Sequence, residues 1–188
     1  MKNFKTTLVL LLLVGVSFTA CKKEKEDVPA PEQTTSINYG NGIIENFQRQ
    51  PNGSTVVFSN WITKTETNWT GFGTFEIKTK INAPSLTDAV RDNGLLLVYF
   101  EYDGNVRPLP AVRIEYGEVV DYSFITQQID ISLRLTGFGN ISGVSDMRFR
   151  YVLIPSSSFG GSGQGARMQT PVDFNDYKAV CEYYGILK

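Results

Sequence analysis

Histidine is absent from this chain of 188 residues. Its absence excludes a Ser-His-Asp triad, a Cys-His dyad and any metal site with histidine ligands. Cysteine is scarce as well, because only Cys21 and Cys181 are present. A disulfide framework is therefore not expected. An excess of charge of one sign is also lacking: 18 Lys and Arg residues face 19 Asp and Glu residues, for a net charge of −1. With no positive excess to neutralise phosphates, no nucleic-acid partner is expected.

Motifs for cofactors and metals are also missing. The glycine-rich stretch 160–165 follows an expected strand, as a phosphate-binding loop would, but no Gly-Lys-Ser/Thr follows it. It is more simply a surface loop. The acidic residues do not have the alternating spacing of a calcium-binding loop. No cofactor and no metal site are therefore expected.

The N-terminus has the pattern of an export signal. Lys2 and Lys5 precede the apolar run 8–16, which is too short to span a membrane comfortably. Residues 18–21, Phe-Thr-Ala-Cys, resemble the lipobox of bacterial lipoproteins, with Phe18 where that pattern usually has Leu. The resemblance implies that 1–20 is a lipoprotein signal peptide and that Cys21 is lipidated, which anchors the protein to a membrane. The alternative is an ordinary secretory signal with a cysteine placed by chance.

Residues 21–36 read as the lipidated cysteine followed by a disordered tether, because a charged run at 22–27 leads into a stretch rich in Pro, Thr and Ser. The charged run also resembles the surface-export signal of Bacteroidetes-type lipoproteins. That resemblance implies the outer leaflet of the outer membrane, with the protein facing the cell exterior. The alternative is a solvated spacer on a lipoprotein that faces the periplasm.

Residues 37–188 are expected to form one mainly β domain. The run 95–100 is continuously apolar, which predicts a strand buried on both faces, and Asp103-Gly104 predicts a tight hairpin turn. The return strand carries Pro108 and Pro110, which favour a sheet edge. Residues 129–135 alternate between apolar and polar. About eight such strands predict an antiparallel β-sandwich, either a jelly-roll or immunoglobulin-like.

Two short helices interrupt the strand pattern. Residues 84–93 are helical in pattern, with Ser85 and Asp88 as a capping pair. A C-terminal helix is expected at 175–184, with Asn175 as its N-cap and Gly185 after its end. Its apolar stripe, which includes Cys181 as a small buried residue, should pack on the body of the domain.

The domain as a whole resembles an uncharacterised domain of Bacteroidetes-type surface lipoproteins that also occurs after collagen-like repeats. The resemblance covers most of residues 56–188, but the collagen-like repeat is missing here, and the family implies no set of catalytic residues. The residues that carry it are Trp61, 92–99, Arg107-Pro-Leu-Pro110, 149–155 and 173–186 with Tyr183-Tyr184-Gly185.

Two aromatic residues are candidates for ligand binding. Trp69 lies in a polar stretch between Asn68 and Thr70, where an exposed indole could stack on a sugar ring or anchor a protein partner. Tyr102 lies beside the expected hairpin tip. The alternative for Trp69 is that its side chain folds back and caps the sandwich, since large aromatic side chains are usually buried.

These observations favour a lipid-anchored cell-surface protein that acts as a non-catalytic binding or adhesion module for a polysaccharide or a protein. One alternative is a structural or accessory subunit of an envelope complex that pairs through the edge strand near Pro108. A less favoured alternative is a glycoside hydrolase, which needs two carboxylates at a defined separation. Its candidate acids are Glu101, Asp103, Asp121 and Asp146.

Overall fold

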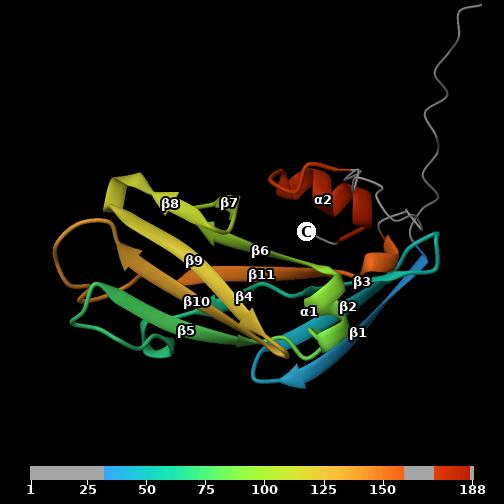
Figure 1. Cartoon of the computed structure of the whole chain (residues 1–188), viewed down its shortest axis with the longest axis horizontal. Helices are drawn as coiled ribbons and strands as arrows, with labels where there is room; N and C mark the ends of the chain where they lie inside the picture. The colour runs from blue at the N-terminus through green and yellow to red at the C-terminus, as the bar shows by residue number, and fades with distance from the viewer. Residues whose placement is uncertain (1–31, 159–171, 187–188) are drawn as a thin grey trace, which may run out of the picture.

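The structure is a computed structural model that describes residues 32–158 and 172–186 (Figure 1). The expected signal peptide, Cys21 and the glycine-rich stretch 160–165 lie outside the described residues. Within the described ranges, no helix combines the length and the apolar character needed to span a membrane.

Two antiparallel sheets pack face to face, which confirms the predicted β-sandwich. The described chain holds eleven strands where the sequence indicated about eight. The larger sheet has the order β1 (Glu32–Gly40), β2 (Ile43–Arg49), β3 (Thr55–Ser59), β11 (Met147–Ile154), β6 (Leu95–Tyr102) and β7 (Asn105–Pro108), with β4 (Ile62–Lys64) also paired to β11. The smaller sheet has the order β5 (Glu76–Asn82), β10 (Gln128–Leu135), β9 (Glu118–Ile125) and β8 (Ala111–Arg113).

The hairpin of β6 and β7 forms as predicted. Leu96 and Val98 face the core between the sheets, and Tyr99 faces the opposite side. Asp103 and Gly104 have φ angles of 51° and 72°, which is the left-handed pair that a two-residue hairpin turn requires. β7 is an edge of its sheet, which confirms the prediction from its prolines.

The first strand begins earlier than the sequence suggested. Residues 32–36, which were expected to belong to a disordered tether, are the first half of β1. β1 has little apolar alternation, so its pairing with β2 depends mainly on the backbone ladder. The ladder is supplemented by side-chain hydrogen bonds from Thr34 to Gln48 and from Ser36 to Asn46.

The first helix is shorter than expected and is capped by a different residue. α1 spans Asp88–Asn93, and Thr87, not Ser85, accepts the hydrogen bond of the Val90 amide. Ser85 is engaged elsewhere, because its backbone amide and its hydroxyl both donate to the buried carboxylate of Glu45. The Tyr151 hydroxyl donates to the same carboxylate at 2.7 Å. This buried cluster ties the segment before α1 to both β2 and β11.

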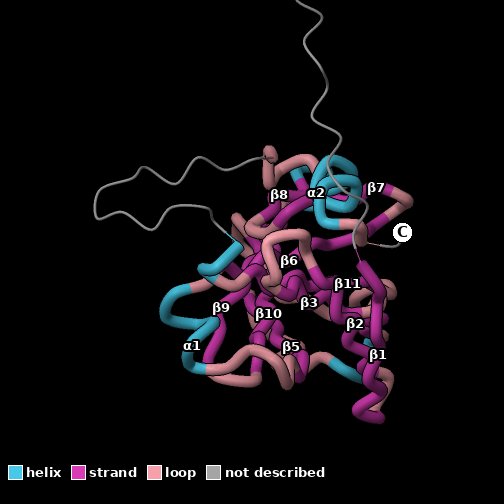
Figure 2. The backbone as a smooth tube through the Cα atoms, turned by 90° about the vertical axis from the view of Figure 1, so that its right-hand side faces the viewer, coloured by secondary structure: helices cyan, strands magenta, loops and turns pink. Residues whose placement is uncertain are grey.

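The C-terminal helix α2 spans Tyr177–Tyr184 and covers the outer face of the larger sheet (Figure 2). Its N-cap is Asp176, whose side chain accepts from the Ala179 amide, so the prediction of Asn175 as the cap is wrong by one residue. Gly185 ends the helix at φ 67°, as predicted. Val180, Cys181 and Tyr184 are buried against β3, β6 and β11, which confirms the predicted stripe and the buried position of Cys181.

A second apolar cluster therefore lies outside the sandwich, under α2, in addition to the core between the sheets. The members of both clusters come from residues 43–186. A chain of residues 32–188 thus contains all described strands and both apolar clusters. It meets the criterion for a domain that folds on its own.

Candidate functional site

One end of the sandwich collects the turns that lie farthest from α1. The β6–β7 turn, the segment between β8 and β9, and the loop 136–146 all lie there, at the left of Figure 1. The short 3₁₀ helix η2 (Ile114–Tyr116) fills the β8–β9 connection. The hydroxyl of Tyr102, at the end of β6, donates to the hydroxyl of Tyr116 at 3.1 Å, which joins the edges of the two sheets.

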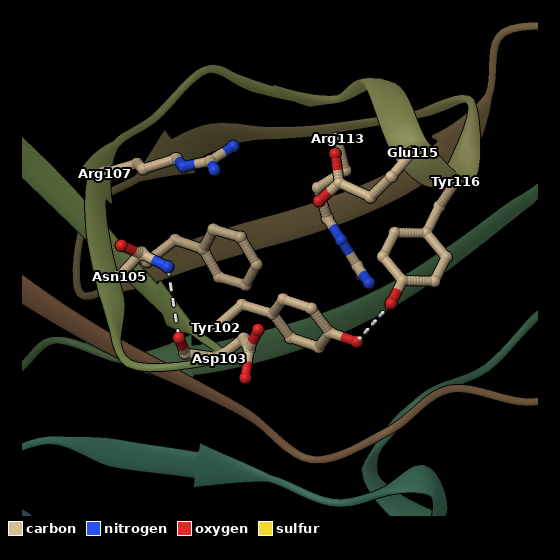
Figure 3. Close-up of a pocket in the computed structure, with 8 residues that line it drawn as sticks. Tyr102, Asp103, Asn105, Arg107, Arg113, Glu115 and Tyr116 are labelled. Atoms are coloured by element: carbon tan, nitrogen blue, oxygen red, sulfur yellow. Dashed lines mark hydrogen bonds between the residues drawn. The ribbon is translucent and has the colours of Figure 1, made fainter.

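A cleft of about 130 Å³ opens at this junction (Figure 3). Two edge regions from opposite sheets build it: the β6–β7 hairpin and the segment from β8 into η2. It is lined by Phe100, Tyr102, Asp103, Asn105, Arg107, Arg113, Glu115 and Tyr116. Three aromatic rings and five charged or amide side chains thus converge in one small concave site.

Arg113 fixes the aromatic wall of the cleft. Its guanidinium carbon lies 3.8 Å from the ring centroid of Tyr102 and 4.2 Å from that of Tyr116. Only 3% of this arginine is exposed, and it forms an ion pair of 3.0 Å with Glu118. Burial raises the pKa of Glu118, while the cation of Arg113 acts in the opposite direction. A cation held between two rings is attracted to both and stabilises their positions.

The two tyrosines differ in their role and in their acidity. One face of the Tyr102 ring is covered by Arg113, and Phe100 is stacked beside it, so Tyr102 is half-buried. Tyr116 is 51% exposed and supplies the open aromatic surface. Once ionised, Tyr102 can accept hydrogen bonds from the hydroxyls of Tyr116 and Ser145, which lowers the pKa of Tyr102. Tyr116 is then the donor to Tyr102, which raises the pKa of Tyr116.

The rim of the cleft carries hydrogen-bonding groups of both signs. Asp103 and Glu115 are exposed carboxylates, and Asn105 is an exposed amide. Arg107 is exposed and donates to the carbonyl of Val112 at 3.5 Å, and it has no acidic partner in the described part of the chain. These groups offer donors and acceptors at the mouth of the cleft.

Trp69, one of the two predicted binding residues, is a core residue. Only 4% of it is exposed, and its ring lies 6.3 Å from that of Phe149. The alternative in which Trp69 caps the sandwich is therefore the one the structure has, and the assignment of Trp69 to a binding site is wrong. The reason lies in the chain around it: η1 (Glu66–Asn68) ends just before Trp69, and Thr70 pairs with Lys78 of β5, which turns the indole inward.

The candidate acids do not gather in one place. Glu101 pairs with Arg148 on the outer face of the larger sheet. Asp121 lies on the outer face of the smaller sheet, 3.6 Å from Arg134. Asp146 is exposed just before β11. Only Asp103 lies in the cleft, where Glu115 is the other carboxylate.

The cleft residues Arg113 and Tyr116 were not predicted. Val112, Ile114 and Tyr116 alternate with Arg113 and Glu115, a pattern that is typical of a single strand. β8 ends at Arg113, however, and η2 turns Ile114 and Tyr116 toward solvent. Gly117, which adopts φ 61°, was the available sign that this strand stops early.

No group of three or more metal-ligating acidic or cysteine side chains occurs among the residues that the structure describes. No family model, curated protein or solved structure matches the chain. The cleft must therefore be interpreted from its own chemistry.

Proposed function

We propose that this protein is a non-catalytic carbohydrate-binding module, anchored by lipid at Cys21 to the outer membrane and displayed at the cell surface. The observation that carries the proposal is the exposed ring of Tyr116 beside a rim of carboxylate, amide and guanidinium groups. The C–H-rich face of a sugar packs on an aromatic ring, while its hydroxyls exchange hydrogen bonds with planar polar side chains. The mixed charge of the rim favours a neutral sugar.

Rigidity supports the same proposal. Because Arg113 holds both tyrosines, and Tyr102 donates to Tyr116, the ring surface is already in place before a ligand arrives. A site that needs little ordering loses less free energy on binding. In this proposal Tyr102, a binding candidate from the sequence, is the ring that supports Tyr116.

The test is a binding screen of residues 32–188 against immobilised neutral polysaccharides. Tyr116→Ala should weaken binding about tenfold or more, because it removes the central aromatic contact. Tyr116→Phe keeps the ring and should retain most of the affinity. Tyr39→Ala, which removes an exposed tyrosine from β1, is the matched control. Binding that survives Tyr116→Ala, or no saturable binding to any polysaccharide, would contradict the proposal.

The same screen tests the non-catalytic assignment. Products released from a bound polysaccharide, and lost in Asp103→Asn or Glu115→Gln, would make the cleft that of a hydrolase, since such enzymes use two carboxylates.

A second candidate, an accessory subunit of an envelope complex, is favoured by β1. This nine-residue strand is the other edge of the larger sheet, and its residues 34–40 are exposed. An exposed edge can pair with a strand of a partner, and β1 offers a longer edge than the four-residue β7. Ile37→Lys should then abolish co-purification of a stoichiometric partner in mild detergent. A partner that is retained by the variant, or a wild-type protein that purifies as a monomer, argues against this role.

A further inference from the structure

Large apolar side chains project from the loop end of the sandwich. Ile114 on η2 is 84% exposed, and Phe138 in the loop 136–146 is fully exposed. Phe75, which precedes β5, is 60% exposed. Isolated exposed apolar residues are ordinary, but a group at one end of a molecule marks a contact surface. We call Phe75, Ile114 and Phe138 the apolar tips.

Hydrogen bonds between neighbouring turns bring the apolar tips together. The Thr136 amide donates to the carbonyl of Gly117 at 2.7 Å, which places the segment before Phe138 against the β8–β9 turn. On the other side, the Leu135 amide donates to the carbonyl of Phe75 at 2.9 Å. The loop that carries Phe138 therefore lies between the segments that carry Ile114 and Phe75.

The exposure of Phe138 is enforced by the fold. Ile141, three residues later, is buried in the core between the sheets. Its backbone is fixed on both sides, because its amide donates to Thr74 and its carbonyl accepts from Gly73. With Ile141 anchored inside, the loop holds Phe138 outside and away from the core.

We propose that the apolar tips insert into the interfacial layer of a zwitterionic lipid bilayer. The tips project from separate turns. Neither Ile114 nor Phe138 lines the cleft or a second, open cavity that lies between Val106 and the start of α2. Protein hot spots usually fill pockets of a complementary partner, whereas a bilayer accepts separate protruding side chains without a matched surface.

The surroundings of the tips also fit a bilayer surface. Tyr116 lies on the same 3₁₀ helix as Ile114 and is hydrogen-bonded to Tyr102, and amphipathic tyrosines are favoured at the level of the lipid headgroups. Arg148 is paired with Glu101 and Arg113 with Glu118, and Arg107 shares the cleft with Asp103 and Glu115, so these groups leave no excess of positive charge. Insertion should therefore depend on apolar contact, not on attraction to anionic lipids.

The position of β1 separates the apolar tips from the membrane in which the lipid anchor is expected. β1 begins at Glu32, opposite Arg49, at the end of the sandwich where β6 starts and β11 finishes (Figure 1). Thirty-one residues precede Glu32, and the β8–β9 connection and the loop 136–146, which carry Ile114 and Phe138, lie at the opposite end. The contact of the apolar tips is therefore separate from the anchor expected at Cys21. It fits a second bilayer, facing the end of the sandwich that points away from the anchor.

The test is flotation of residues 32–188 with phosphatidylcholine vesicles. The double variant Ile114→Ser/Phe138→Ser should lower the vesicle-bound fraction at least about tenfold, because it removes two large apolar side chains. The matched control Ile125→Ser/Tyr183→Ser also removes two exposed large side chains, from outside the loop end, and should bind like the wild type. Added anionic lipid and added salt should leave binding unchanged.

Three results would overturn the proposal: no flotation of the wild-type domain, equal loss in both double variants, or binding only to anionic vesicles. Tryptophan placed at the tip gives a second readout. The emission of Phe138→Trp should shift to the blue on vesicle addition, while that of Ile125→Trp should not. Flotation without this shift would place the contact elsewhere and overturn the proposal. A folded variant that still binds polysaccharide but no longer floats separates this inference from the proposed glycan site.

Discussion

At the residue scale, the site depends on Arg113, a buried cation between two tyrosine rings. Its charge is balanced by Glu118, so the rings are held by a neutral pair and not by an uncompensated charge. Arg107 lies in the same cleft but is exposed and has no acidic partner in the described ranges. The two arginines of the cleft are therefore placed differently: Arg113 is buried between the rings, and Arg107 is exposed at the rim.

The acidity of Tyr102 provides a direct check of this arrangement. Hydrogen bonding lowers the pKa of Tyr102, so it should ionise at a lower pH than an ordinary tyrosine. Burial instead raises the pKa of Tyr184 to about 12. In a spectrophotometric titration, Tyr102→Phe should remove the earliest tyrosine step. Tyr184→Phe is the control and should leave that step in place. An early step that persists in Tyr102→Phe would show that this step belongs to another tyrosine.

Replacement of Trp69 should affect stability directly. Trp69→Ala should lower the free energy of unfolding by about 3–5 kcal/mol, because it leaves a cavity beside Phe149. Trp69→Phe should cost less, since it keeps a ring and removes an indole N–H that has no hydrogen-bond partner among the described residues. Phe138→Ala, at an exposed aromatic, should change stability by less than about 0.5 kcal/mol. Denaturant unfolding measures all three, and an unchanged midpoint for Trp69→Ala would contradict its burial.

At the scale of elements, side-chain hydrogen bonds decide where the two helices begin. Serine is a good capping residue, but the Ser85 hydroxyl donates to the carboxylate of Glu45, and α1 begins after Thr87 instead. At the second helix, Asn175 bonds to Asp173, and Asp176 caps α2. In both helices the cap predicted from the sequence was near the true one and was displaced by a competing partner.

The cap of α2 can be tested by two neighbouring substitutions. Asp176→Ala should lower the free energy of unfolding by about 1 kcal/mol, because the Ala179 amide loses its acceptor. Asn175→Ala should cost less than about 0.5 kcal/mol, since Asn175 is exposed and lies before the helix. Thermal unfolding of both variants distinguishes the two positions. A larger loss for Asn175→Ala would restore it as the cap.

At the scale of the whole molecule, the larger sheet is buried on both faces. One face packs on the smaller sheet, and the other is covered by α2. The central strands β11 and β6 therefore contribute side chains to both clusters. The continuous apolar run at 95–100 is thus required by the two-sided burial of β6.

Removal of α2 should therefore destabilise the whole domain. A chain of residues 32–171 would expose the surface of Val56, Phe58 and Tyr99 that α2 covers. The loss should be on the order of 5 kcal/mol, comparable with the stability of a domain. Binding of a hydrophobic dye would report the exposed apolar surface, and size-exclusion chromatography would report the resulting aggregation. The control, residues 32–186, keeps α2 and should remain monodisperse. A stable, soluble 32–171 chain would contradict this role of α2.

The sequence by itself determined the β-sandwich, the β6–β7 hairpin and the buried stripe of α2. Each of these follows from local patterns: alternation along strands, a left-handed turn at Asp103-Gly104 and a helical period before Gly185. The hairpin pattern also put Tyr102 beside the turn, where it lines the cleft; its role in binding stays a prediction.

Only the tertiary structure decided the rest, because the deciding contacts join residues distant in sequence. Trp69 is buried because it meets Phe149, and β1 is a strand because β2 offers it a backbone ladder. Tyr116 lines the cleft because β8 ends at Arg113 and the guanidinium of Arg113 lies between the rings of Tyr102 and Tyr116. A periodic pattern records which side of an element is apolar, but it does not record which elements cover that side.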